Sequence, residues 1–186
     1  DPKLRQARGV YYTPVEVVQT QVRLIEELLT SPDYFGKAKG YADEDVNVLD
    51  PATGTGTYPL AVVDRAVESI RNRLGVGAVP GEMTNLARRI YGFELLVGPY
   101  AVAHLRLAQR LRDAGARLPK DGPRVYLTDT LESPDREAES RPSIMVRRLS
   151  QEHRRAQAVK RDVPVLVCLG NPPYDREQRD PEETTE

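Results

Sequence analysis

Residues 46–57 decide the fold, and they read Val46-Asn47-Val48-Leu49-Asp50-Pro51-Ala52-Thr53-Gly54-Thr55-Gly56-Thr57. The apolar start is typical of a short buried strand, here expected over residues 46–49. After the glycine turn, apolar side chains recur at helical spacing until Gly75, at Leu60, Val63, Val67, Ile70 and Leu74. A strand, a glycine turn and a helix in this order predict one unit of a parallel sheet, with a ligand at the turn.

The same alternation of strand and helix continues toward the C-terminus. Further strands are expected over residues 89–93, 125–127 and 163–169, and helices over 83–89, 99–115 and 143–161. An earlier helix is expected to begin at Thr13-Pro14, with Thr13 as the cap and Glu16 completing a capping box. The pattern predicts an α/β fold with a doubly wound parallel sheet of about four strands.

Composition limits the kind of protein this is. The chain has 186 residues, which suffices for one packed domain, and its net charge of -1 provides no overall positive field for nucleic acid. No apolar run is long enough to cross a membrane, and Cys168 has no second cysteine to pair with, so a cytoplasmic protein is expected. One cysteine and two scattered histidines predict no metal site. Cys168 itself is expected to be buried in its apolar strand.

The glycine turn has three possible nucleotide-binding interpretations. A phosphate-binding loop requires Gly-Lys-Ser/Thr, but Gly56 is followed by Thr57 and Tyr58. A dinucleotide-binding loop requires a small residue where Pro59 stands. The third interpretation is a loop around the methionine part of S-adenosylmethionine, with Asp50 near the positively charged end of that ligand. A plain tight turn between strand and helix stays open as an alternative.

Carboxylates follow the next two expected strands. Glu94 comes directly after residues 89–93, where it could accept both hydroxyls of a ribose, and Asp129 follows residues 125–127, where it could accept from an adenine amino group. Either one alone could be a solvated loop residue. Because the ends of parallel strands share one edge of a sheet, their position beside the glycine turn favours a nucleoside site.

The fourth expected strand ends in Gly170-Asn171-Pro172-Pro173-Tyr174. The two prolines fix the backbone and remove two amide donors, so Asn171 and Tyr174 flank a stiff segment with exposed carbonyl acceptors. A rigid turn with no chemical role is the alternative interpretation.

Taken in order, these motifs resemble adenine-specific (N6) DNA methyltransferases of the gamma type, in which the cofactor region precedes the target-recognition region. Residues 171–174 look like the catalytic motif of amino-directed methyltransferases, residues 50–56 like their cofactor loop, and residues 9–14 like their N-terminal cofactor motif. Residues 91–95, with 101–105 downstream, further resemble the methyltransferase domain of type ISP restriction–modification enzymes. The implied fold is Rossmann-like and incomplete, with about four of its strands present.

The resemblance implies S-adenosylmethionine as cofactor and a role for each motif. The closing segment would be Tyr12, Thr13 and Pro14, and the methionine portion would be held by Asp50, Pro51, Ala52, Thr53, Gly54, Thr55, Gly56 and Thr57. Glu94 would bind the ribose and Asp129 the cofactor adenine, with Leu95 and Thr130 in the same site. The catalytic residues would be Asn171, Pro172, Pro173 and Tyr174. Pro59 departs from the leucine that is more usual in the family.

The expected reaction is methyl transfer to the N6 amino group of adenine in double-stranded DNA. The side-chain carbonyl of Asn171 and the main-chain carbonyl of Pro172 would accept the amino hydrogens, and Tyr174 would stack on the flipped base. We expect residues 1–186 to be a fragment of the catalytic core: a helical closing segment (1–45), an α/β core (46–174) and a polar tail (175–186). Helicase, nuclease and target-recognition domains are expected in the parent chain, and the isolated fragment is expected to be inactive.

Two other functions remain open from the sequence. Methyltransferases that act on RNA or on a protein glutamine share residues 171–174, but they generally lack a Tyr-Tyr-Thr-Pro segment such as residues 11–14. A non-catalytic cofactor-binding module is the second alternative. Basic side chains of the helix over 143–161 are interpreted as a solvated face rather than a DNA contact: Arg147, Arg148, Arg154, Arg155, Lys160 and Arg161.

Overall fold

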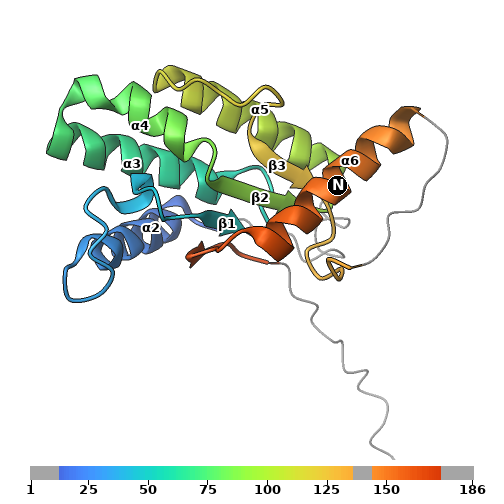
Figure 1. The fold of residues 1–186 in the computed structure, drawn as a ribbon, viewed down its shortest axis with the longest axis horizontal. Helices are drawn as coiled ribbons and strands as arrows, with labels where there is room; N and C mark the ends of the chain where they lie inside the picture. The colour runs from blue at the N-terminus through green and yellow to red at the C-terminus, as the bar shows by residue number, and fades with distance from the viewer. Residues whose placement is uncertain (1–12, 136–143, 173–186) are drawn as a thin grey trace, which may run out of the picture.

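A computed structural model describes residues 13–135 and 144–172 of the chain (Figure 1). In chain order its longer elements are α2 (Val15–Thr30), β1 (Val48–Asp50), α3 (Thr57–Leu74), α4 (Val79–Leu86), β2 (Ile90–Glu94), α5 (Val97–Asp113), β3 (Arg124–Leu127), α6 (Ile144–Asp162) and β4 (Val167–Cys168). Two short 3-10 turns, η1 (Gly40–Ala42) and η2 (Val76–Ala78), lie in the connections.

The four described strands form one parallel sheet with the order β3-β2-β1-β4. Val48 of β1 lies opposite Ile90 of β2 on one side and Val167 of β4 on the other. The chain moves outward from β1 to β3 and then crosses back over the sheet to β4, so the strand order reverses between β1 and β4. This arrangement confirms the predicted Rossmann-like α/β fold. In such folds the ligand site lies at the carboxyl ends of the strands beside this switch point.

Side chains on alternate strand residues pack against different helices. Ile90 and Val125 join the main core with α2, α3, α4 and α5, whereas Tyr91, Phe93 and Tyr126 pack on the other face. That second face is covered by α6 through Ala156 and Val159, which are both buried. Helices therefore lie on both faces of the sheet, as a doubly wound fold requires (Figure 1).

Several local predictions were wrong. The short helix expected over residues 83–89 is α4, Val79–Leu86, and the long strand expected over 163–169 is reduced to β4. Cys168 was expected to be buried, but it is exposed because β4 is the outer strand of the described sheet and this residue points away from the main core.

The start of α2 also differs from the prediction. Pro14 is the N-cap rather than the first helical residue, and no side chain caps this helix, so the capping box of Thr13 with Glu16 is not formed. Inside α2, Glu26 is only 1% exposed and accepts the main-chain N–H of Tyr41 at 3.0 Å. This bond ties the loop before β1 to α2, an arrangement that hydrophobic spacing does not reveal.

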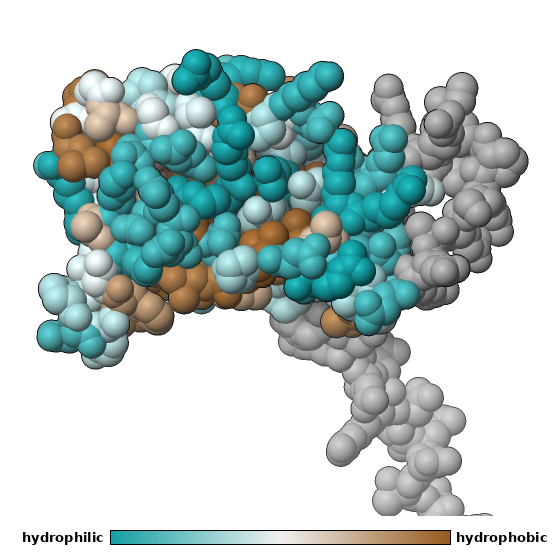
Figure 2. Space-filling view, in the orientation of Figure 1, coloured by the Kyte–Doolittle hydropathy of each residue, from teal (hydrophilic) through white to brown (hydrophobic). Residues whose placement is uncertain are grey.

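The molecular surface of the described residues is mostly hydrophilic in the view of Figure 2, with hydrophobic patches toward the left and lower parts of that face. None of the helices among the described residues combines the length and apolar character needed to span a bilayer.

Candidate functional site

The glycine turn after β1 has the backbone conformation that its sequence predicts. Gly54 and Gly56 have φ angles of 54° and 88°, in the left-handed region that favours glycine. The N–H of Gly56 donates to the carbonyl of Thr53 at 2.8 Å, and α3 begins at the next residue. Pro59 fits in the first turn of α3, because the N–H groups there have no partner within the helix. The turn thus lies at the strand-end edge of the sheet, directly before α3.

Asp50, the last residue of β1, is a buried carboxylate with one oxygen available. Its side chain accepts the N–H of Ala52 at 3.0 Å through Oδ1, while Oδ2 is buried and has no hydrogen-bond partner among the described residues. Burial away from solvent is the main reason that the pKa of Asp50 is raised to about 7. The hydrogen bond from the Ala52 N–H lowers this pKa, and the nearby charge of Glu94 raises it. A buried acceptor without a donor is costly unless a ligand satisfies it.

Glu94 at the end of β2 is held against the glycine turn. Its Oε2 accepts the N–H of Gly54 at 2.8 Å, and its Oε1 accepts the N–H of Leu96 at 2.7 Å. Each carboxylate oxygen has a second lone pair, so both can still accept a hydroxyl hydrogen. Leu95 beside it is 64% exposed and so leaves an apolar side chain at the surface next to this carboxylate.

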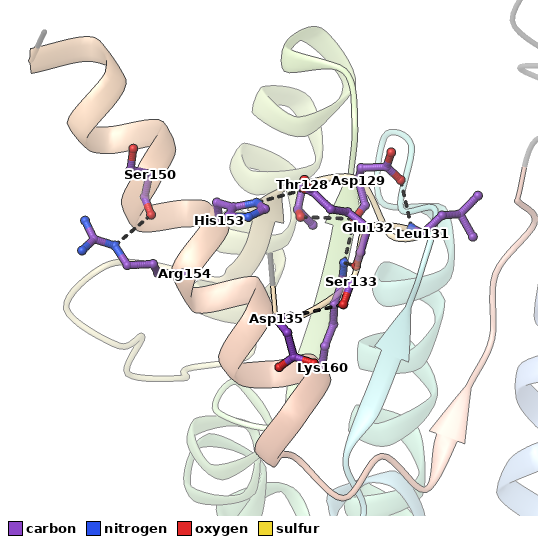
Figure 3. Close-up of polar contacts among 10 residues, drawn as sticks. All are labelled: Thr128, Asp129, Leu131, Glu132, Ser133, Asp135, Ser150, His153, Arg154 and Lys160. Carbon is purple, nitrogen blue, oxygen red and sulfur yellow. Dashed lines mark hydrogen bonds and ion pairs between the residues drawn. The ribbon is translucent and has the colours of Figure 1, made fainter. Parts of the chain in front are cut away.

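The loop after β3 approaches the same edge of the sheet. Thr128 continues the ladder by donating its N–H to the carbonyl of Glu94 at 2.9 Å, and the Thr130 hydroxyl donates to the carbonyl of Pro51. Asp129 is exposed, and its Oδ1 accepts the N–H of Leu131 at 2.9 Å, which leaves Oδ2 for another donor (Figure 3). The loops after β1, β2 and β3 are therefore joined by hydrogen bonds.

Asn171 lies at this edge too, beyond the end of β4. Gly170 packs against the side chain of Asp50: a Cβ atom at Gly170 would lie 2.4 Å from Asp50 Oδ1. The amide Nδ2 of Asn171 donates to the hydroxyl of Thr13 at 3.0 Å, so the side-chain carbonyl of Asn171 is turned away from that contact. Gly54, Glu94, Asp129 and Asn171 thus share one edge of the sheet, whereas the predicted site residues Tyr12, Pro173 and Tyr174 lie outside the described residues.

A groove of about 490 Å³ adjoins the turn that carries Asn171. Its lining consists of side chains of α2 and the end of β4 together with Pro51: Gln21, Leu24, Ile25, Cys168, Leu169, Gly170 and Pro172. Its volume is in the range of small-molecule sites. Among the described residues, no group of three or more His, Cys, Asp or Glu side chains is placed to hold a metal ion.

Three residues at this edge have contacts that the sequence did not predict. Thr13 was expected to cap a helix but contacts Asn171, and Arg106 of α5 donates to the carbonyl of Thr55 at 2.9 Å. Lys160, interpreted as part of a solvated basic face, instead reaches the loop after β3. Only the helical spacing of Lys160 from buried Ala156 could have indicated that it faces inward.

Comparison with known proteins agrees with this arrangement. The solved structures most similar to the chain include the ATP-dependent type ISP restriction–modification enzyme LlaBIII bound to DNA, with a TM-score of 0.69 and 25% identity over 92% of this chain. The structure of DrdV in complex with DNA matches with a TM-score of 0.67 and 25% sequence identity over 97% of this chain. A nuclease-deletion mutant of the type ISP enzyme LlaGI, in complex with a DNA substrate mimic, matches with a TM-score of 0.67 and 22% sequence identity over 94% of this chain. At this identity the match shows a similar fold and no more.

The chain corresponds to a small part of these proteins, 11% of LlaBIII, 15% of DrdV and 14% of LlaGI. A search of curated protein sequences gave no match. The sequence model of the family described as N-6 DNA Methylase matches residues 2–186, which is nearly the whole chain. The strand-end edge with its glycine turn, three carboxylates and asparagine therefore lies in a methyltransferase domain that resembles those of type ISP restriction–modification enzymes, and the chain belongs to the N-6 DNA methylase family.

Proposed function

We propose that the full-length protein transfers a methyl group from S-adenosylmethionine to the N6 amino group of adenine in double-stranded DNA, and that residues 13–172 contain the cofactor site and part of the catalytic site. The observation that carries this proposal is the orientation of Asn171. Its amide nitrogen is engaged by Thr13 at 3.0 Å, at the same edge as the glycine turn, and its carbonyl is left to accept a hydrogen.

The residues present suit S-adenosylmethionine chemically. The buried Oδ2 of Asp50 lacks a partner among the described residues and matches the positively charged end of this ligand. Glu94 keeps a free lone pair on each oxygen for the ribose hydroxyls, and Asp129 keeps Oδ2 for the adenine amino group. When bound, this cofactor supplies a methyl group on a positively charged sulfur, which is open to attack by a nitrogen lone pair.

The role of Asn171 and Pro172 follows from the electronic structure of adenine. The lone pair of the amino nitrogen is delocalised into the ring, so this nitrogen is a poor nucleophile. Acceptance of one hydrogen by Asn171 Oδ1 and of the other by the Pro172 carbonyl draws the nitrogen toward tetrahedral geometry and localises the lone pair. Catalysis then consists of orientation and electrostatic stabilisation, and no residue of the chain forms a covalent bond.

DNA binding and sequence choice are assigned to the full-length protein. LlaBIII and DrdV were solved with DNA and are far longer than this chain. We also propose that the parent chain carries helicase, nuclease and target-recognition domains and that it acts in the cytoplasm. Within residues 1–186, the proposed divisions lie at residues 45/46 and 174/175. We further propose that residues 1–186 alone bind cofactor weakly and do not methylate.

The direct test is transfer from tritiated S-adenosylmethionine by the full-length protein. Duplex DNA, RNA and a glutamine-containing protein are offered separately, and the product is digested and identified. N6-methyladenine in DNA is expected. Label in RNA or in a glutamine side chain favours the alternative substrates instead, and absence of label with all three rejects the proposal.

Gly170→Ala tests the close approach of the catalytic turn to β1. The added methyl group would overlap Asp50 Oδ1, so the turn must move, and a shift of this kind is expected to lower kcat by at least about tenfold. Gly81→Ala is the matched control, because nothing lies within 4 Å of a Cβ atom there. Steady-state methylation of DNA by the two full-length variants checks this prediction, and equal kcat values contradict it.

Thr13→Val tests the orientation of Asn171. Valine has nearly the shape of threonine but cannot accept from Asn171 Nδ2, so the amide is free to rotate. We expect a fall in kcat of roughly five- to tenfold, the size of one lost hydrogen bond, with rescue by Thr13→Ser. A variant that changes only the KM for cofactor would show that Thr13 acts on the cofactor and not through Asn171.

A further inference from the structure

Lys160 lies at the point where α6 meets the loop after β3. Its ammonium group donates to the main-chain carbonyls of Asp129 at 2.7 Å and of Glu132 at 2.8 Å (Figure 3). Hydrogen bonds from a charged donor are stronger than neutral ones, and these two hold the turn from Asp129 to Glu132 against the helix. Lys160 is thus a bridge between α6 and the segment that carries Asp129 and Thr130.

The same ammonium group lies 5.7 Å from the centre of the Phe93 ring. Phe93 is 1% exposed and directly precedes Glu94, so this cation–π contact extends the bridge to the end of β2. The partial burial that these contacts require lowers the pKa of Lys160, although the carboxylates of Asp129 and Glu132 oppose that effect. A solvated surface lysine would not be placed in this way.

A second contact from the same face of α6 supports the loop. His153 Nδ1 lies 3.5 Å from Glu132 Oε2, and both side chains are mostly buried, at 18% and 21% exposure. His153 and Lys160 are seven residues apart, about two helical turns, and therefore lie on one side of the helix. Since Ala156 and Val159 fix this helix on the sheet, the loop is tied to a rigid support.

We propose that Lys160 is a positioning residue for the nucleoside half of the cofactor site, acting through the main chain at Asp129 and through Phe93 at Glu94. This inference rests on the proposed function, because it assigns these two carboxylates to the nucleoside. The carbonyl of Asp129 belongs to the peptide that joins Asp129 to Thr130, so fixing it restrains the main chain that carries both side chains. Lys160 itself touches neither the methyl group nor the target base.

The experiment compares Lys160→Met with the parent full-length protein. Methionine preserves much of the side-chain volume but donates no hydrogen bond. We expect the KM for S-adenosylmethionine to rise about tenfold, while kcat at saturating cofactor and the KM for DNA stay within about twofold. The inhibition constant of 5′-methylthioadenosine, which carries the nucleoside without the amino acid, should rise in parallel with the KM for cofactor.

Arg161→Met is the matched control, because among the described residues Arg161 pairs only with its exposed neighbour Asp162. This substitution should leave all of these constants unchanged. Lys160→Arg keeps a charged donor and should recover most of the affinity for cofactor. Lys160→Gln should give a KM for cofactor between those of the parent and Lys160→Met, and it replaces the methionine variant if that variant unfolds. An unchanged KM for cofactor, or a fall in kcat with no change in KM, overturns the inference. If the parent protein methylates no DNA, it is the proposed function that fails.

Discussion

Asn171→Ala should abolish methyl transfer by the full-length protein while leaving S-adenosylmethionine bound. The substitution removes the side-chain carbonyl that accepts an amino hydrogen of the target adenine, an interaction needed in the transition state and absent from the cofactor contacts. The expected loss in kcat is at least about 10²–10³-fold, the effect of deleting one preorganised polar group at a reacting centre. Single-turnover methylation of DNA, with cofactor affinity measured separately by calorimetry, checks both parts.

Asn171→Asp is the informative companion variant. It retains a side-chain oxygen but loses the Nδ2 that donates to Thr13 at 3.0 Å. We expect partial activity at most: above that of Asn171→Ala, because the carboxyl group keeps an oxygen that can accept an amino hydrogen, and below that of the wild type, because the contact with Thr13 that orients the side chain is lost. Methylation by Asn171→Ala at the wild-type rate would contradict the mechanism.

Asp50→Asn should stabilise the protein above neutral pH and at the same time weaken cofactor binding. The carboxyl is 1% exposed, and burial raises its pKa to about 7 from a model-peptide value of 3.8. Below about pH 4 the group is protonated in both the folded and the unfolded chain. Between these two pKa values the unfolded chain releases the proton and the folded chain keeps it, so stability falls as pH rises and then levels off above about pH 7.

Asparagine removes this penalty, and its Oδ1 can still accept from Ala52. The removed penalty is on the order of 4 kcal/mol above pH 7, less the cost of a buried amide N–H without a partner. The melting temperature of Asp50→Asn relative to wild type should therefore be higher at pH 8 than at pH 5. Scanning calorimetry of the full-length protein at the two pH values measures this difference.

The effect of Asp50→Asn on the cofactor should have the opposite sign. Without an ionisable carboxylate facing its positively charged end, S-adenosylmethionine should bind at least about tenfold more weakly. Asp45→Asn is the control, because the side chain of Asp45 is 77% exposed and its ion pair among the described residues is a surface contact with Lys37. Equal melting shifts at both pH values, together with unchanged cofactor affinity, would show that Asp50 is an ordinary structural residue.

Short-range patterns in the sequence were enough to predict the order of the elements. The pattern of residues 46–57 predicts a strand, a glycine turn and a helix, and in the turn Gly54 and Gly56 adopt φ angles that other residues avoid. Apolar spacing also placed the face of α3 and the presence of four strands. It failed for β4, where only Val167 and Cys168 find a partner in β1, because a strand is defined by pairing that its own sequence does not specify.

The candidate site divides in the same way. The residue types at the strand ends, Asp50, Glu94, Asp129 and Asn171, and their common edge follow from the sequence, because parallel strands all end on one side of a sheet. Their roles stay predictions, as do those of Tyr12, Pro173 and Tyr174. Only the tertiary structure decided which of these groups are already engaged: Thr13 holds the amide of Asn171, and Lys160 holds the loop of Asp129. It also leaves one oxygen of Asp50 without a hydrogen-bond partner in the part of the chain that the structure describes. These contacts join residues 31 to 158 positions apart, and no local pattern encodes them, because they depend on how the helices and loops pack around the sheet.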